Sequence, residues 1–517
     1  MSIWRNLCRL PPSSAVQRLR FEGLRHLSVI TMSDPATAST SSIAVTATTE
    51  NEPKLDDTNN KAMDDAKGDD DDNNSKKRKK RPYANLKKKR KESATAHQAA
   101  IERKGGRKGG DEAISEKNTN PHDGSFAHPR MRELYDVSLP EDLPEESKVS
   151  KKKLAILMSY LGGKFAGFQI NKEQRTVQAE LELALYKAGL LQKSNFGFPH
   201  KYGWSTSGRT DKGVHACAQV VSAKLEMGEL TEDEVRERIN AQLHPDILVL
   251  DVKRTIRSFC AKTQRSRVRY QYMIPSYLFF PEAKKLFEDA GVVGTKNKFE
   301  DPLSAEEVQS LRPKLIDYRI SSQQLTTLKS ALALYVGTHA YHSFTKGMNP
   351  GDATAQRYIL EFTADDPVIR EDGSEWIPTQ VLGQAFLLNQ IRKMIAMACD
   401  VVCERATLQT VEEAFDKTKK MILPVAPAQG LFLDMSVYDH YNERKNKCST
   451  DVEDLDWINQ PNGPVMQRWK QFKDDVLLKK IVEEEAQDGN FIKYLYSQTN
   501  VFEWEEKYGI GDTTKEE

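Results

Sequence analysis

The segment Gly203-Trp-Ser-Thr-Ser-Gly-Arg-Thr-Asp-Lys-Gly-Val-His-Ala216 concentrates more residues able to carry chemistry than any other stretch of this chain. Arg209 and Asp211 lie between Gly208 and Gly213, two glycines that permit a tight loop with positive backbone angles. A predicted strand follows directly, so the loop side chains would be fixed at a strand end. Loops held by a rigid scaffold are common sites of catalysis. From these residues alone, the segment is either a catalytic loop or an ordinary turn with a charge pair.

Other candidate sites in the sequence have simpler explanations. His215 could act as a base, but a histidine packed in the core is the favoured interpretation. Cys399 and Cys403 lie four residues apart in an apolar helical stretch, and no second ligand pair has zinc-like spacing, so buried thiols are favoured over a metal site. We find no nucleophile elbow, P-loop, dinucleotide fingerprint or metalloprotease pair, so hydride transfer and nucleotide hydrolysis have no support.

Strand and helix patterns alternate twice between residues 153 and 440. Strands are predicted over 153–162, 216–225, 247–255, 268–277, 357–363, 379–388 and 430–437, and helices over 176–189, 231–243, 323–335 and 389–403. The pattern predicts an α/β or α+β core and excludes all-helix and all-strand folds.

The length and composition of the chain indicate more than one domain and some disorder. The 517 residues are too many for one compact domain, and 29% charged against 38% hydrophobic residues predicts disorder in part of the chain. The 76 basic and 75 acidic residues give a net charge of +1, so only the local distribution of charge can indicate partners. No apolar run is long enough to cross a membrane, and six scattered cysteines suit a reducing compartment.

The amino-terminal region carries two signals. Residues 1–31 hold five arginines against one acid, Glu22, with apolar residues between them, which is typical of a mitochondrial targeting segment; the alternative is an unstructured tail. Residues 32–150 read as a disordered arm of acidic and basic runs. Eleven of the sixteen residues 76–91 are cations, which fits a nuclear import signal, a phosphate-binding arm or a solvated tail.

Two further segments flank the predicted core. Residues 281–320 are charged and irregular in pattern, and we expect them to be an insertion between an amino-terminal half (151–280) and a carboxy-terminal half (321–440). Residues 441–517 are expected to be a helical extension. A stripe of large apolar side chains in this extension should dock on the core, namely Trp457, Trp469, Phe472, Leu477 and Ile481.

The sequence GRTDKGVHA at 208–216 resembles the signature of TruA-type tRNA pseudouridine synthases. Four further stretches resemble the same family in the same order: SYLGGKFAGFQ with TVQAELELAL, RVRYQY, YVGTHAYHSFT, and GQAFLLNQIRKM followed by PAQGLFL. The resemblance covers residues 153–440. The basic arm, the large insertions and the serine before Gly208 look like the eukaryotic nuclear and mitochondrial branch.

The resemblance implies roles for five residues. Asp211 matches the family's catalytic aspartate, and Arg392 matches the arginine that pairs with it and keeps it ionised in a dry pocket. Arg209 matches the residue proposed to help flip the target nucleotide, which costs a few kcal/mol. Tyr270 matches the tyrosine that stacks on the base, and Leu431 matches an apolar residue lining the pocket; core packing is the alternative for Leu431.

The resemblance also implies the fold, the reaction and the partners. The core should be α+β, with two ferredoxin-like halves joined into one long, mostly antiparallel sheet around a central cleft. Uracil would be detached, turned and rejoined through carbon without a cofactor or metal, after attack by Asp211 on the sugar or base or removal of a ribose proton. The partner would be tRNA, mainly in and around the anticodon stem-loop, with small nuclear and messenger RNA as further candidates. The protein would be a monomer with no membrane partner, located in the nucleus with a second, mitochondrial form.

Cations around the motifs would form the tRNA-binding cleft, although each taken singly also fits a solvated surface charge. The candidates are Lys164, Arg175, Lys262, Arg265, Arg267, Arg269, Lys346 and Lys393. Two rival functions remain: a related synthase restricted to the boundary of the anticodon stem and loop, and a non-catalytic RNA-binding chaperone using the same cleft.

Overall fold

The computed structural model describes residues 133–135, 149–171, 174–292, 303–447, 451–457 and 462–499. The expected targeting segment (1–31) and almost all of the arm expected over 32–150 lie outside these residues. The same is true of part of the insertion (293–302) and of the last residues of the extension (500–517).

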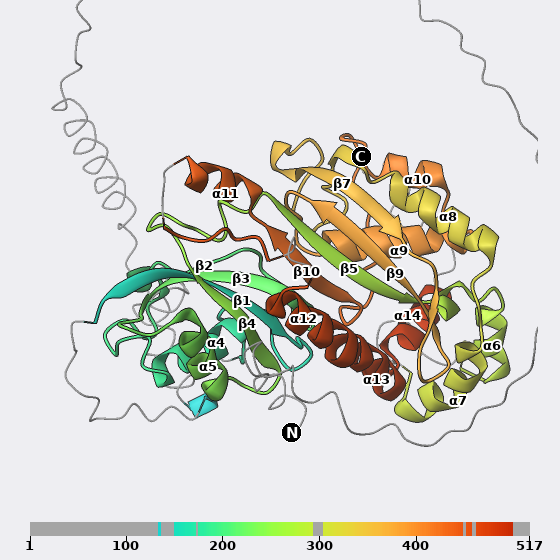
Figure 1. The fold of residues 1–517 in the computed structure, drawn as a ribbon. Helices are drawn as coiled ribbons and strands as arrows, with labels where there is room; N and C mark the ends of the chain where they lie inside the picture. The colour runs from blue at the N-terminus through green and yellow to red at the C-terminus, as the bar shows by residue number, and fades with distance from the viewer. Residues whose placement is uncertain are drawn as a thin grey trace, which may run out of the picture. The chain divides into compact units, whose positions relative to one another are not determined.

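One mixed sheet runs through the described residues, with helices packed around it (Figure 1). Its strand order is β4-β1-β3-β10-β5-β9-β7-β6, with β2 added to β3 and β8 to β9. The strands are β1 (Lys151–Tyr160), β2 (Ser205–Thr206), β3 (His215–Glu226), β4 (Ile247–Arg254), β5 (Arg267–Pro275), β6 (Gly337–Ala340), β7 (Gln356–Ala364), β8 (Val368–Ile369), β9 (Glu375–Gly383) and β10 (Leu431–Val437).

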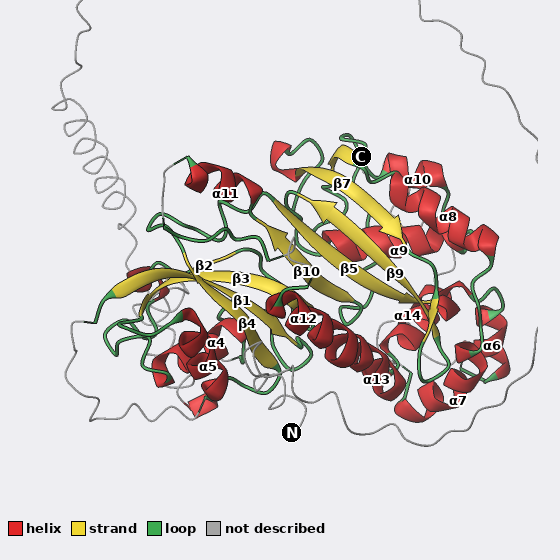
Figure 2. Cartoon of the chain, viewed as in Figure 1, coloured by secondary structure: helices red, strands yellow, loops and turns green. Residues whose placement is uncertain are grey.

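The helices agree with an α+β fold, as expected from the sequence (Figure 2). They are α4 (Val177–Lys187), α5 (Glu232–Gln242), α6 (Ala283–Asp289), α7 (Ala305–Ile316), α8 (Ser322–Ala333), α9 (Gln390–Val402), α10 (Leu408–Glu413), α11 (Asp439–Asn446), α12 (Pro464–Gln471), α13 (Leu478–Asp488) and α14 (Asn490–Thr499). No helix in the described part of the chain is both long and apolar enough to span a membrane.

The central strands are buried on both faces, which explains their unbroken apolar sequences. Every residue of β1 from Lys153 to Tyr160 is buried, and β3 is buried at all positions except Lys224. Helix α5 packs on β4, α4 packs on α5, and α12 also contacts β4. The α5 helix begins with a capping box, in which Thr231 and Glu234 each accept a hydrogen bond from the other's backbone.

Strands β3 and β10 form the only parallel pair among the described strands, with His215 opposite Phe432 and Ala216 opposite Leu433. Parallel pairing places the starts of both strands at one edge, so the loop before β3 and the turn before β10 meet there. On its other side β10 pairs antiparallel with β5, which brings Tyr270 opposite Leu433. This junction in the middle of the sheet positions the candidate site.

The sheet does not divide where the sequence suggested. We expected a half formed by residues 151–280, but β5 lies beyond β10 and pairs with β9. The predicted strand over 379–388 is also displaced, because β9 ends at Gly383. At Gly383 a Cβ atom would lie only 2.8 Å from the Phe386 ring, and the apolar residues after Gly383 turn out of the sheet to line a cavity.

The insertion and the carboxy-terminal extension pack on one another. Helices α6 and α7 of the insertion contact α14, and α7 also contacts α13. Gln309 donates a hydrogen bond to the Ala486 carbonyl (2.8 Å), and the Tyr496 hydroxyl donates to the Val292 carbonyl (3.1 Å). The two segments that looked accessory in the sequence therefore form one structural unit with the core.

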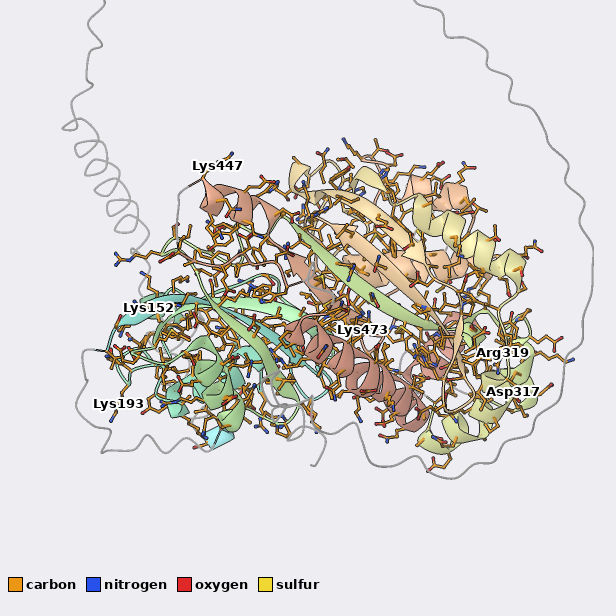
Figure 3. All side chains as sticks on the ribbon, in the orientation of Figure 1. Lys152, Lys193, Asp317, Arg319, Lys447 and Lys473 are labelled. Atoms are coloured by element: carbon orange, nitrogen blue, oxygen red, sulfur yellow. The ribbon has the colours of Figure 1, made fainter. Side chains whose placement is uncertain are left out.

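The predicted apolar stripe of the extension docks on the core as expected, because all five of its side chains are buried. Helices α12 and α13 are joined by a π-helical turn, Phe472–Leu477, which contacts β3. Lys473 in this turn, labelled in Figure 3, forms an ion pair of 3.3 Å with the buried carboxylate of Asp434 on β10. Docking therefore combines apolar burial with charge pairing.

Replacing Phe472 with alanine should destabilise the protein by about 3–5 kcal/mol, because a fully buried ring is lost from the contact between extension and sheet. Ile422→Ala is the matched control: Ile422 is 69% exposed, and its loss should cost less than about 0.5 kcal/mol. Equilibrium denaturation in urea measures both. Equal stabilities for the two variants would show that the extension is not part of the cooperative core.

Candidate active site

A cavity of about 700 Å³ lies at the junction of β3, β10 and β5. Its walls come from the Trp204–Asp211 segment with Val214, from the start of β5, from residues 385–391 after β9, and from Leu431 at the start of β10. Four of the five residues to which the family resemblance assigns roles line it: Arg209, Asp211, Tyr270 and Leu431. The cavity therefore joins segments that are up to 262 positions apart in sequence, from Gln169 to Leu431.

The loop that carries Asp211 is held by close backbone contacts. Gly213 has φ +79°, as expected, whereas Gly208 does not have a positive φ. A Cβ on Gly208 would instead lie 3.4 Å from both the Arg265 Nη1 and the Tyr270 hydroxyl, so a side chain there would crowd the cavity wall. A Cβ on Gly162 would lie 2.1 Å from the Val214 carbonyl oxygen, so only glycine fits beside this loop.

Polar contacts from the sheet fix the same loop. The Gln219 side-chain amide on β3 donates to the Gly208 carbonyl (2.8 Å), and the hydroxyls of Tyr160 and Thr210 are 2.8 Å apart. His215 is fully buried, and its Nδ1 accepts a hydrogen bond from the Gly162 backbone (3.0 Å). Burial lowers the pKa of His215 to about 4, so the ring is neutral at physiological pH. The prediction of a core histidine is confirmed.

Asp211 is half-buried at the wall of the cavity, where the backbone N–H of Asn389 donates a hydrogen bond to its carboxylate. Burial raises the pKa of Asp211 above its usual value, while the charge of Arg392 and the Asn389 hydrogen bond act in the opposite direction. The charge of Arg392 therefore favours the ionised form, as expected, but burial has the larger effect. The carboxylate is consequently more basic than an exposed aspartate.

Arg392 acts on Asp211 without contacting it directly. Both residues are described, and no ion pair of 4.0 Å or less joins them, contrary to the close pair we expected. The guanidinium instead donates from Nε to the Ala426 carbonyl (2.6 Å) and from Nη1 to the Asn389 side-chain oxygen (3.3 Å). Asn389 has φ +60°, an unusual conformation for a residue other than glycine. Arg392 thus holds in place the residue whose N–H binds Asp211.

Tyr270 is nearly buried, and its ring lies edge-to-face against Phe386 with 5.5 Å between centroids. Burial raises the pKa of its hydroxyl to about 12, so the phenol stays protonated and can donate a hydrogen bond. Leu431 is buried in the cavity wall, opposite Tyr272 in the sheet. Arg209 is exposed and has no hydrogen bond or ion pair with the described part of the protein.

Of the eight cations predicted for an RNA-binding cleft, six lie outside the cavity wall and two line it. Four form ion pairs: Lys164 with Asp246, Arg175 with Glu180, Arg267 with Asp439, and Arg269 with Asp434. Lys393 donates to the carbonyls of Ser343 and Thr345, and Lys346 is exposed away from the cavity wall. Only Lys262 and Arg265 of the eight line the cavity, together with Arg209.

The described residues contain no group of three or more His, Cys, Asp or Glu side chains able to hold a metal ion. Cys399 is buried and is not part of a disulfide, and the Cys403 thiol donates to the Leu278 carbonyl (3.4 Å). Cys399 is therefore a buried thiol within helix α9, as expected, whereas Cys403 is half-buried at the C-cap of the helix.

Comparisons with known proteins identify the family of the chain. The sequence model of the tRNA pseudouridine synthase family matches residues 331–439, which include Arg392 and Leu431. The chain is 32% identical to tRNA pseudouridine synthase 1 of Kluyveromyces lactis over 60% of this chain and 65% of that protein. It is 30% identical to tRNA pseudouridine synthase 1 of Yarrowia lipolytica over 68% of this chain and 78% of that protein. The pseudouridylate synthase 1 homolog of Mus musculus is 30% identical, over 71% and 78% respectively.

The chain belongs to the tRNA pseudouridine synthase family. It is therefore an isomerase, and the cavity around Asp211 is its candidate active site. The resemblance found in the sequence is confirmed at the level of the family.

Sequence reasoning missed three residues at the site of this synthase: Phe386, Asn389 and Gln390. All three occur in GQAFLLNQIRKM, which was assigned to a strand and a helix rather than to a cavity wall. The Gln390 side-chain oxygen accepts a hydrogen bond from the Leu387 backbone (2.8 Å), so Gln390 shapes the loop that carries Phe386. An asparagine directly before the helix was a local signal for the αL turn.

Replacing Arg392 with glutamine should move the acid limb of the kcat/KM profile to higher pH. We expect Asp211 to act in its ionised form, and removing the guanidinium charge takes away a contribution that lowers its pKa. The loss of activity relative to wild type should therefore be greater at pH 6 than at pH 8. Initial rates of pseudouridine formation in tRNA across this pH range measure the position of the acid limb.

Arg392→Lys keeps the charge and should keep the limb near its wild-type position. Arg319→Gln removes a surface charge whose contacts lie outside the cavity and should leave the whole profile unchanged. A uniform, pH-independent loss in Arg392→Gln would contradict an electrostatic role.

Proposed function

We propose that this synthase converts uridine to pseudouridine at several positions in and around the anticodon stem-loop of tRNA, and that small nuclear and messenger RNA are further substrates. One observation carries the proposal: a basic, half-buried carboxylate, Asp211, faces a cavity edged by an aromatic ring and unpaired cations. The cavity volume, about 700 Å³, falls within the range of about 300–1,000 Å³ typical of ligand pockets.

The isomerisation balances without an external reagent. The bond between ribose C1′ and uracil N1 breaks, a bond from C1′ to C5 forms, C5 loses its proton and N1 gains one. Asp211 would attack the sugar, attack the base, or remove a ribose proton, and its raised pKa favours each of these roles by increasing basicity.

The target base has to leave its stack before it can enter the cavity, at a cost of a few kcal/mol. We assign Arg209 to this step because its guanidinium is exposed at the cavity wall and is free to bind RNA. Tyr270 would stack on the extruded base, which contributes about 1–3 kcal/mol per base. Leu431 would contact the base from the start of β10.

The arrangement of the sheet supports two ferredoxin-like halves that meet between β3 and β10, with the cavity as the central cleft. Of the two rival functions, the chaperone is disfavoured because a half-buried carboxylate at the wall of a basic cavity weakens the binding of a polyanion and would serve no purpose in binding alone.

Replacing Asp211 with asparagine should abolish pseudouridine formation and preserve or strengthen tRNA binding, because a negative charge is removed from the site. Release of tritium from tRNA carrying [5-³H]uridine measures the reaction, since the C5 hydrogen is lost, and filter binding measures affinity. Asp233→Asn, which neutralises an exposed carboxylate on α5, is the control and should retain full activity.

Product formation by Asp211→Asn at the wild-type rate would remove Asp211 from its role. A wild-type protein that binds tRNA but releases no tritium would favour the chaperone. Activity confined to one boundary position of the anticodon stem would favour the narrower synthase.

We also propose that the protein acts in the nucleus and has a mitochondrial form, from the two amino-terminal signals. A reporter fused to residues 1–31 should enter mitochondria, and one fused to residues 32–110 should enter the nucleus. Fluorescence microscopy of each fusion, beside the unfused reporter, measures this. Cytosolic signal from both fusions would contradict the proposal.

A further inference from the structure

Arg265 lies two residues before β5 and lines the cavity. Its Nη1 donates a hydrogen bond to the Ser207 carbonyl in the signature loop, and its Nη2 donates to the Gln384 carbonyl (2.9 Å) just after β9. The guanidinium therefore links the signature loop to the segment that follows β9.

The partners of this guanidinium are all neutral. No ion pair of Arg265 occurs among the described residues, and its Nε–H is buried without a hydrogen-bond partner. Arg267 and Arg269, two and four residues further along, are instead paired with Asp439 and Asp434. A guanidinium next to a nucleotide cavity, with no anionic partner of its own, has unused capacity to bind an anion.

Strand geometry separates these arginines by function. Successive residues of β5 point to opposite faces, so Val268 and Tyr270 line the cavity while Arg267 and Arg269 line a separate hollow of about 200 Å³. Arg265 precedes the strand, so this alternation does not apply to it, and it lines the active-site cavity, whereas Arg267 lies on the other face of the sheet.

We propose that Arg265 is a substrate-binding residue that grips a backbone phosphate beside the target uridine, exchanging the Gln384 carbonyl for that phosphate when RNA enters. The Nε and Nη2 edge of a guanidinium forms a two-point fork for a phosphate, and here Nε is unpaired and Nη2 has only a carbonyl. A charged acceptor binds this fork more strongly than a carbonyl does.

The exchange would also couple RNA binding to the cavity wall. Residues 385–389, which follow Gln384, include Phe386 beside Tyr270 and Asn389 beside Asp211. Releasing the Gln384 carbonyl would free the start of this segment, which would link phosphate binding to the placement of Phe386 and Asn389. The inference rests on the proposed function, in which the cavity receives a uridine of RNA.

The test uses full-length protein carrying Asp211→Asn, so that binding is measured without turnover, and unmodified tRNA over a series of salt concentrations. Adding Arg265→Gln should weaken affinity about tenfold near 0.15 M salt and reduce the slope of log affinity against log salt by about 1. Arg267→Gln is the matched control. It removes the same charge from the paired arginine two positions away, and should leave both quantities unchanged.

Arg265→Lys separates charge from geometry. A lysine keeps the point charge but not the fork, so it should preserve the salt slope and weaken affinity by less than Arg265→Gln does. Thermal melting checks that each variant is folded. If Arg265→Gln does not fold, the test rests on the tRNA affinity of Arg265→Lys. Wild-type affinity in Arg265→Lys would then overturn the proposal.

An Arg265→Gln variant that is folded and keeps the salt slope and affinity of Arg267→Gln would show that Arg265 only holds the walls together. Failure of the wild-type protein to form pseudouridine in tRNA would instead contradict the proposed function. The two failures are therefore distinguishable.

Discussion

Two residue pairs, His215 with Phe432 and Ala216 with Leu433, join strands that lie more than 200 positions apart in the sequence. Because the pairing is parallel, the loop carrying Asp211 and the turn leading to Leu431 leave the sheet at the same edge. Strand β5 completes the site by pairing with the other side of β10, which brings Tyr270 next to Leu433. Without this short parallel pairing, Asp211, Tyr270 and the apolar wall at Leu431 would not be held next to one another.

Two opposing effects set the pKa of Asp211. Burial makes the carboxylate more basic, and Arg392 limits this effect both by its charge and by holding Asn389, whose N–H binds the carboxylate. An intervening asparagine keeps the guanidinium from neutralising Asp211 in a tight pair. The arrangement leaves a carboxylate that can be ionised yet retains the reactivity that a direct salt bridge would suppress.

Much of this could be predicted from the sequence where the signal is local. Unbroken apolar runs predict the buried strands β1 and β3, and the capping residue Thr231 predicts the start of α5. Motif identity predicts Asp211, Tyr270 and Leu431 at one cavity. The same reasoning does not predict which cations are neutralised, because the ion-pair partners of Arg267 and Arg269 are Asp439 and Asp434, far along the chain. It also fails for residues 384–389, whose apolar character fits a strand as well as a cavity wall.

The position of β10 has a consequence for how the protein is made. The strand that fills the middle of the sheet is among the last parts of the core to leave the ribosome. From the end of β3 at residue 226 to the end of β10 at residue 437 there are 211 residues. At about 5–20 residues per second, this takes roughly 10–40 s. During that interval the nascent chain carries an open strand edge on β3, a template for wrong pairing that chaperones or rapid burial by neighbouring segments must protect.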